Sequence, residues 1–372
     1  MIVRKWPLLS VMLFFACATF PLYILPPGLP QPSHYIFAIL SFATAITFRR
    51  FLFRKEEALL LCLFAWMAIR QAFYFLTGGI FIDSFVPVIF FGFNLALYGA
   101  VALYATARRD EAAKAAIGGV MCALLIAVIL LLTSGFITTV QPGSAGVSRS
   151  VAGFNNPNQL GYFAIGCAGI IVFARLTNKL SGGGFILLSA VCVVIAVASL
   201  SKAAMIGIVF YGIAFLRSIK GAALILGVLL VFGIGLYYVG AKDFAAVDRL
   251  ATIGQSSDDN LVSRGYGPLV DPDARFLFGW GEGYVTSQIG HETHSTLGNV
   301  LISYGFVGAA IFLGFLGLIF RRLVVGFGLL PALGLCLPYL LYGLTHNGFR
   351  FSVVWVMLAV FASVPVVSAR RN

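Results

Sequence analysis

The sequence alternates between long apolar runs and short polar segments, which predicts a helical protein that crosses a membrane many times. A spanning helix needs about 20 predominantly apolar residues. The apolar runs and their flanks predict spans near 7–26, 33–48, 58–77, 85–106, 115–137, 159–175, 184–200, 203–216, 222–240, 296–320, 323–345 and 351–369. The predicted fold is therefore an all-α polytopic membrane protein with about twelve transmembrane helices.

One long polar segment interrupts this pattern before the tenth span and divides the chain into three parts. Residues 1–240 form the first membrane bundle, with spans 1–9, and residues 294–372 form spans 10–12. Between them, residues 241–293 form a large loop that mixes acidic and basic side chains. This mixed composition predicts a small folded cap instead of an extended linker.

Composition excludes a soluble globular protein. The chain is 60% hydrophobic and only 10% charged, with a mean hydropathy of +0.99, whereas soluble domains carry about 25% charged residues. In a membrane protein, a net charge of +12 is explained by basic residues that flank the spans on the cytoplasmic side. No nucleic-acid partner is therefore expected. The six cysteines all lie in apolar runs without CxxC spacing, which predicts core residues and neither disulfides nor metal ligands. No metal or other cofactor is expected.

The positions of the basic residues predict the orientation in the membrane. With the N-terminus in the cytoplasm, basic residues occur at all seven predicted cytoplasmic positions, as the positive-inside rule requires. These residues are Arg4, Lys5, Arg49, Arg50, Arg54, Lys55, Arg108, Arg109, Lys114, Arg175, Lys179, Arg217, Lys220, Arg321, Arg322, Arg370 and Arg371. Both termini are then cytoplasmic, and the first apolar run is expected to be an uncleaved span.

The basic residues outside these flanks are candidate functional groups. They are Arg70, Arg149, Lys202, Lys242, Arg249, Arg264, Arg275 and Arg350. Arg70 lies in the third span beside Gln71, and Lys202 interrupts an apolar run. A charge at membrane depth is costly unless it faces a cavity or a partner, so each indicates function. The alternative is a structural ion pair or a side chain that reaches the interface.

A second extracytoplasmic segment, residues 138–161, is also polar. It contains Arg149, followed by Asn156, Pro157 and Asn158 at the entrance of the sixth span. Asn-Pro favours a turn, and asparagine caps helices well, so a capped helix entrance is the structural alternative to a substrate-binding role. The predicted spans contain no central carboxylate and show no inverted repeat, which argues against an ion-coupled transporter.

The outer cations and His294 together predict a site for a polyanion such as a lipid-linked pyrophosphate. Arginine matches phosphate oxygens in a bidentate manner and stays charged at any working pH. A histidine can accept a proton from an acceptor hydroxyl. Glu292 is the alternative base, and a helix cap or an interfacial side chain is the structural alternative for His294.

Several motifs are similar to those of the bacterial O-antigen ligase and Wzy-type O-antigen polymerase superfamily. His294-Ser295, nine residues and then Gly305-Phe306-Val307-Gly308 resemble its histidine motif. In the same order as in the family come Arg149 with Gly153 and Asn156-Pro157-Asn158, Ser201-Lys202-Ala203-Ala204, Arg264, and Gly279-Trp280-Gly281-Glu282-Gly283. The resemblance covers residues 140–310 well and the remainder only through topology. Lys202 departs from the family, which has arginine there.

The resemblance implies an inverting, metal-independent glycosyltransferase with a GT-C-like helical fold and a periplasmic active site in the bacterial inner membrane. The donor is a glycan on undecaprenyl pyrophosphate. Arg264 and Lys202 are expected to hold the pyrophosphate, and His294 to activate or position the acceptor. Arg149 is a candidate for donor or glycan contact. Charge placement adds Arg275 and Arg350, while Arg70, Asn156, Asn158 and Glu292 complete the substrate-binding candidates.

The acceptor remains open between two enzymes. A polymerase transfers the chain to another lipid-linked repeat unit, and a ligase transfers it to the lipid A core. The form of residues 153–161 favours a polymerase of O-antigen or exopolysaccharide. A lipid-linked oligosaccharide flippase and a structural envelope protein are the rival classes. A chain-length regulator is a further possible partner that the sequence does not identify.

Overall fold

In the described part of the chain, the computed structural model is entirely helical and contains no strand. It describes residues 6–26, 29–48, 54–133, 151–216, 261–262, 264–270, 276–289 and 293–365, with isolated residues between 223 and 234. The longer helices are α1 (Trp6–Ala18), α2 (Pro32–Thr47), α3 (Lys55–Leu76), α4 (Phe81–Ala107), α5 (Arg109–Thr133), α6 (Pro157–Leu176), α7 (Gly182–Ala198), α8 (Lys202–Phe210), α13 (Thr296–Phe327), α14 (Leu329–Thr345) and α15 (Ser352–Ala362). The 3₁₀ segment η1 (Tyr211–Phe215) continues α8, and two short helices, α11 (Gly267–Val270) and α12 (Glu282–Ile289), precede α13.

The helices form a multi-pass membrane protein. Five described helices are long and apolar enough to cross a membrane, and six further helices are shorter but apolar. The outer face of α2 shows why a bilayer is required, because Tyr35, Ile39, Phe42 and Ile46 follow helical spacing and are all exposed. Eleven of the predicted spans correspond to described helices, while the ninth, near 222–240, lies largely outside the described residues.

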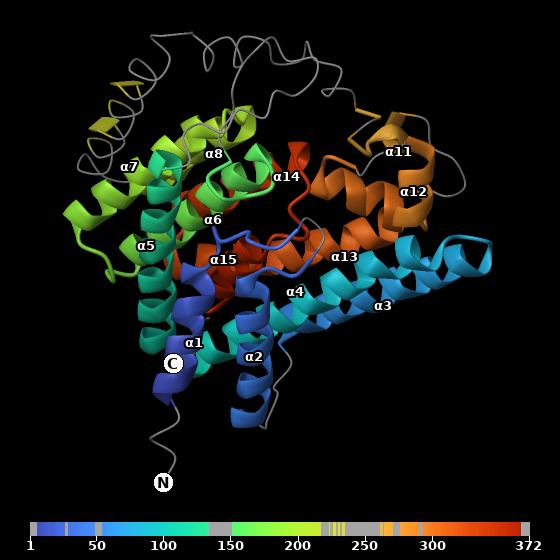
Figure 1. The fold of residues 1–372 in the computed structure, drawn as a ribbon, viewed down its shortest axis with the longest axis horizontal. Helices are drawn as coiled ribbons and strands as arrows, with labels where there is room; N and C mark the ends of the chain where they lie inside the picture. The colour runs from blue at the N-terminus through green and yellow to red at the C-terminus, as the bar shows by residue number, and fades with distance from the viewer. Residues whose placement is uncertain are drawn as a thin grey trace, which may run out of the picture.

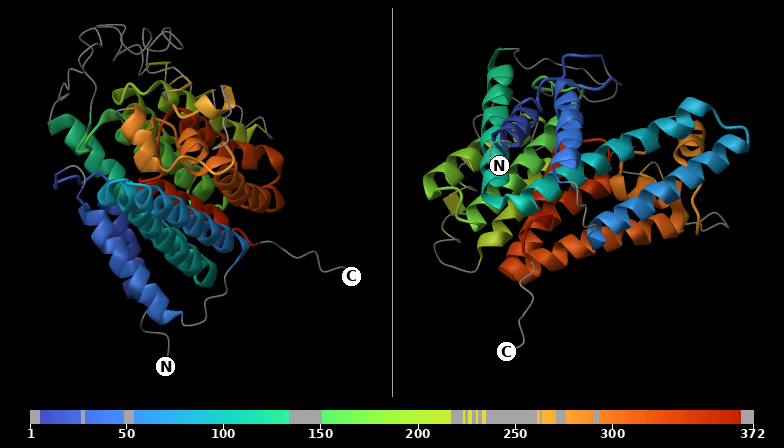
Figure 2. Two further views of the ribbon diagram at one scale, coloured as in Figure 1. Left: turned by 90° about the vertical axis from the view of Figure 1, so that its right-hand side faces the viewer. Right: turned by 90° about the horizontal axis from the view of Figure 1, so that it is seen from below.

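The centre of the bundle consists of α6 and α15. Every residue of α15 is buried, and α6 is buried along most of its length, as expected for helices that are apolar on all sides. In Figure 1, α3, α4 and α13 lie alongside one another, and α1, α2 and α5 cross them steeply. Figure 2 shows the α3–α4 hairpin reaching past the other helices, with α12 near its tip.

Two of the predicted cytoplasmic flanks, those of Arg54 and Arg322, lie at one end of this core. The Arg54 guanidinium donates to the Ala362 carbonyl at the end of α15. Arg322 pairs with Glu56, whose side chain is only 3% exposed, at the start of α3. Two basic segments that are distant in the chain therefore lie at the same end of the bundle. Arg322 does not mark a loop, however, because α13 continues to Phe327.

α13 ends at Gly328 and not at the charged pair Arg321-Arg322, and Gly305 interrupts the helix. Gly328 has a φ of +91°, a left-handed conformation that suits a helix end, whereas arginine is a good helix former and continues the helix. Gly305 has a φ of 69° and a ψ of −172° inside α13. Gly279 packs directly on it, since a Cβ added to Gly279 would lie 2.4 Å from the Gly305 nitrogen.

The freed backbone groups around Gly305 are satisfied by the segment before α12. The Trp280 amide donates to the Ile302 carbonyl at 2.9 Å, and the Phe306 amide donates to the Phe276 carbonyl at 2.9 Å. Two glycine motifs that resembled those of the polymerase and ligase superfamily therefore form one backbone-to-backbone contact. This contact anchors the end of the large loop to α13, next to the start of that helix.

Candidate functional site

A cavity of about 400 Å³ lies at the end of the bundle opposite Arg54 and Arg322. At this end α2 and α6 begin, and the segment after α14 turns back. Three of its lining residues are histidines, six carry amide side chains and four are aromatic. The lining residues are Tyr23, Leu29, Gln31, His34, Phe90, Asn155, Asn156, Pro157, Asn158, Gln159, Tyr162, Thr293, His294, His346, Asn347, Arg350 and Phe351. Among the described residues, this lining contains no carboxylate and one fixed cation, Arg350.

Four residues singled out in the sequence meet in this cavity: Asn156, Asn158, His294 and Arg350. They come from the start of α6, the entrance to α13 and the segment between α14 and α15. Asn156 is also a helix cap, because its side chain accepts the Gln159 amide at 2.9 Å. The capped entrance predicted as the structural alternative is therefore present, and it presents a row of amides to the cavity.

The start of α13 fixes the place of His294. Its neighbour Ser295 is the N-cap, fully buried, and its hydroxyl accepts the Gly298 amide and donates to the Gly343 carbonyl, both at 2.9 Å. Tyr266 places its hydroxyl 2.8 Å from that of Ser295. Burial raises the pKa of Tyr266, so its hydroxyl stays protonated at neutral pH. The exposed His294 thus projects from a buried, hydrogen-bonded support.

Thr296 ties this support to the end of α14. Its amide and hydroxyl both donate to the His346 carbonyl, at 3.1 and 2.9 Å. The Thr296 hydroxyl also accepts the Gly348 amide at 2.7 Å, and the Tyr162 hydroxyl donates to the His346 carbonyl at 2.6 Å. These contacts bring His346 to the same cavity as His294 and order the backbone on both sides.

The last turn of α14, residues 342–346, joins the other sequence motifs to the cavity. The Tyr342 hydroxyl donates to the Asn158 carbonyl at 2.9 Å and lies 3.1 Å from the Ser201 hydroxyl. The Tyr342 ring stacks on His346, with 4.6 Å between centroids. We call residues 342–346 the α14 terminal turn.

Lys202 and Arg264 approach this turn outside the residues that line the cavity. Arg264 donates from its guanidinium to the Thr345 carbonyl. The Thr345 hydroxyl is in turn 2.9 Å from Nδ1 of His346. Lys202 begins α8 directly after Ser201, which contacts Tyr342. Arg264 therefore contacts the α14 terminal turn directly, Lys202 follows a residue that contacts it, and His346 at the end of the turn lines the cavity.

Arg350 and Arg70 have structural partners that define their surroundings. Arg350 lines the cavity and pairs with the buried Glu282 of α12 at 3.4 Å. Glu282 also accepts a hydrogen bond from the Tyr304 hydroxyl at 2.9 Å. Arg70 does not line the cavity. Its guanidinium donates to the Gly279 carbonyl and lies over the Phe73 ring, 5.2 Å from the centroid.

Thr293 supplies a buried hydroxyl beside His294. This residue lines the cavity with 3% of its surface exposed, and its Oγ1 has no hydrogen-bond partner among the described residues. An unsatisfied buried hydroxyl costs about 1–3 kcal/mol. A bound ligand group would offset this cost.

Sequence reasoning missed His34, His346 and Tyr342. Each lies at the end of an apolar run and carries no local motif. The signal available for His346 was its place beside Asn347 at the outer end of the eleventh predicted span. Arg149, Arg275 and Glu292 lie outside the described residues.

Comparison with protein-family models gives no match for the sequence, and comparison with curated proteins gives none either. The geometry of the cavity and the residue motifs around it are therefore the basis for assigning a function.

Proposed function

We propose that this chain is a bacterial inner-membrane glycosyltransferase that polymerises undecaprenyl-pyrophosphate-linked oligosaccharides into O-antigen or exopolysaccharide. The observation that carries the proposal is the assembly around the α14 terminal turn. His294 shares a cavity with His346, and Arg264 contacts the residue before His346. A histidine, a fork of guanidinium donors and a row of amides thus occupy one end of a membrane bundle.

The donor pyrophosphate would lie between Arg264 and Lys202. Negative charge builds on this leaving group as the glycosidic bond breaks, and fixed cations stabilise that charge. Arg264 donates to the Thr345 carbonyl, and the planar fork of a guanidinium matches phosphate oxygens. The reaction we propose is inverting and uses no metal.

His294 would accept the proton of the attacking hydroxyl, or position that hydroxyl. It lies outside the helix cap and is exposed, so an acceptor can reach its ring. A neutral imidazole ring can accept a proton from a hydroxyl. Glu292, two residues earlier in the chain, is the alternative base.

The remaining cavity wall suits a glycan. Amide side chains such as Asn156, Asn158 and Asn347 both donate and accept hydrogen bonds, as sugar hydroxyls do. Tyr23 and Phe351, both half-buried, add flat apolar surfaces for the carbon faces of the sugar rings. The Thr293 hydroxyl provides a further buried donor and acceptor.

The charge distribution supports a periplasmic location for the cavity. Arg54 and Arg322 lie at the opposite end of the core, and basic flanks face the cytoplasm in membrane proteins. The same charge distribution supports cytoplasmic termini. A flippase could bind the same pyrophosphate but would release the donor unchanged.

The direct test uses purified protein and lipid-linked repeat units, with and without EDTA. The proposal predicts that polymer forms and that one undecaprenyl pyrophosphate is released for each glycosidic bond made. EDTA should change neither the amount of polymer nor the amount of undecaprenyl pyrophosphate. Transfer only to a lipid A core acceptor would identify a ligase. Donor translocation in vesicles without bond formation would overturn the assignment as an enzyme.

A further inference from the structure

A second cavity, of about 250 Å³, lies at the opposite end of the core from the histidines. The two cavities contact opposite ends of α6, since Pro157 lines the first and Thr177 the second. Twenty helical residues span about 30 Å, close to the thickness of the hydrocarbon layer of a bilayer. This second cavity is thus at the level of the other membrane interface.

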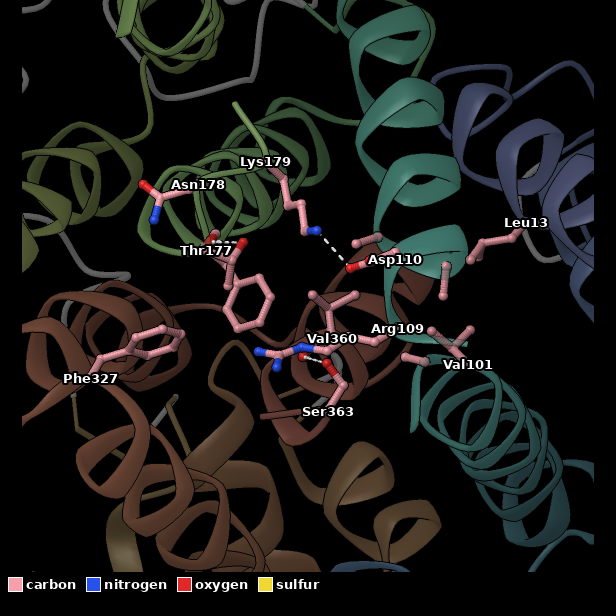
Figure 3. Close-up of a pocket in the computed structure, with 14 residues that line it drawn as sticks. Leu13, Val101, Arg109, Asp110, Thr177, Asn178, Lys179, Phe327, Val360 and Ser363 are labelled. Atoms are coloured by element: carbon pink, nitrogen blue, oxygen red, sulfur yellow. Dashed lines mark hydrogen bonds and ion pairs between the residues drawn. The ribbon is translucent and has the colours of Figure 1, made fainter. Parts of the chain in front are cut away.

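Two cations, one at the start of α5 and one in the connection between α6 and α7, reach this cavity (Figure 3). Arg109, at the start of α5, extends its guanidinium across the opening toward α6 and α13. It makes no hydrogen bond or ion pair within the described part of the chain. Lys179 lies above it and pairs with Asp110, with 2.6 Å between Nζ and Oδ1.

Besides these two cations, the lining offers the Asn178 amide and the hydroxyls of Thr177 and Ser363 as donors. The hydroxyls of Thr177 and Ser363 already donate to carbonyls of their own helices, at 2.9 Å to Phe173 and 2.6 Å to Val360. Both residues cap carboxyl ends of helices, where the helix dipole disfavours an anion. A bound anion would therefore depend on Arg109 above all.

The rest of the cavity wall is apolar and lies next to Arg109 and Lys179. Leu13, Phe173, Phe327 and Val360 line it. Of these four, only Phe327 keeps exposed apolar surface. A small soluble anion would gain nothing from it, whereas the glycerol or upper acyl carbons of a lipid would bury apolar surface against it. Basic pockets between transmembrane helices on the cytoplasmic side are known sites for lipid head groups.

We propose that this second cavity binds the phosphate of a membrane phospholipid, held by Arg109 and Lys179, with the start of an acyl chain against Phe327. Asp110 orients Lys179 and faces any cationic part of the head group. The proposal requires only that the protein is embedded in a membrane and does not depend on the glycosyltransferase assignment.

The experiment is native mass spectrometry of the full-length protein, purified in mild detergent and titrated with phosphatidylglycerol or phosphatidylethanolamine. The wild-type protein is expected to retain one bound lipid molecule more tightly than its other bound lipid molecules. Arg109→Ala and Lys179→Ala are each expected to weaken this binding about fivefold, given about 1 kcal/mol for each cation near a membrane surface. Unfolding temperatures check that both variants fold.

Arg321→Ala is the matched control, because Arg321 is exposed on the same predicted flank and does not line the cavity. It should bind lipid as the wild type does. Equal weakening by all three variants would show a general surface charge effect and overturn the site. Unchanged binding in Arg109→Ala would also overturn it. Stabilisation by inorganic phosphate equal to that by lipid would show that the ligand is a free anion.

Discussion

Arg264 donates a hydrogen bond to the carbonyl of Thr345, although 81 positions separate them in the chain. Thr345 is the last residue of α14, and His346 directly after it lines the same cavity as His294. Arg264 and His294 are thereby both held next to the α14 terminal turn. In the proposed reaction, this arrangement would put leaving-group stabilisation beside a base.

Charge at position 202 should matter more than side-chain shape. Lys202→Ala is expected to lower the turnover rate about a hundredfold, as for loss of one group that stabilises leaving-group charge. Lys202→Arg should keep wild-type activity or exceed it, because the guanidinium adds bidentate donors. Initial rates of polymer formation test both variants. Equal activity of Lys202→Ala and wild type would contradict a pyrophosphate role.

Two serine caps allow structural and functional effects to be separated. Ser295→Ala removes the buried cap of α13 and should cost about 1–2 kcal/mol of stability. It should also lower activity, since the cap supports His294. Ser181→Ala removes the exposed cap of α7, which accepts the Gly184 amide, and should change stability alone. Thermal unfolding and polymerisation rates should be measured together. Equal activity of the two variants would contradict the positioning role of Ser295.

The contact between Gly279 and Gly305 should tolerate no side chain. Gly279→Ala is expected to destabilise the protein by about 3 kcal/mol, because its φ is +79° and the new Cβ would meet backbone atoms of α13. Gly317→Ala is the control, since nothing lies within 4 Å of a Cβ at that position of the same helix. It should leave the unfolding temperature unchanged or raise it. Similar losses in both would contradict the packing described.

The ion pair between Arg322 and Glu56 should be one of the main electrostatic supports of the fold. Arg322→Ala leaves a buried carboxylate without its partner and should cost about 3 kcal/mol. The double variant Arg322→Leu with Glu56→Leu should recover much of that loss. Asp110→Ala, in an exposed pair, should hardly change the unfolding temperature. A double variant less stable than Arg322→Ala would contradict this account.

Much of the membrane bundle could be predicted because apolar runs report helices directly. The spans near 58–77, 85–106 and 159–175 correspond to α3, α4 and α6 within a few residues. The end of the tenth span was misplaced, since Arg321 and Arg322 continue α13 and Gly328 ends it. Charged residues are good signals of topology but poor signals of helix ends.

The candidate site could be predicted only where a local motif marked it. Asn156 and His294 stood in such motifs, and both line the cavity. Tyr342 and His346 did not, because their importance comes from long-range contacts with Asn158 and Thr296. Tertiary contacts of this kind produce no periodic pattern in a single sequence. The structural role of Arg70 on the Gly279 carbonyl was hidden for the same reason.

The most direct measurement is glycan profiling of a deletion strain complemented with wild type or with His294→Ala. The profile should separate lipid-linked single units, long polymer on undecaprenyl pyrophosphate and polymer on lipid A. The account predicts that wild type restores polymer, whereas His294→Ala accumulates single units. Long polymer left on undecaprenyl pyrophosphate would identify a ligase. A normal profile from His294→Ala would contradict the central claim that this histidine acts in glycosyl transfer.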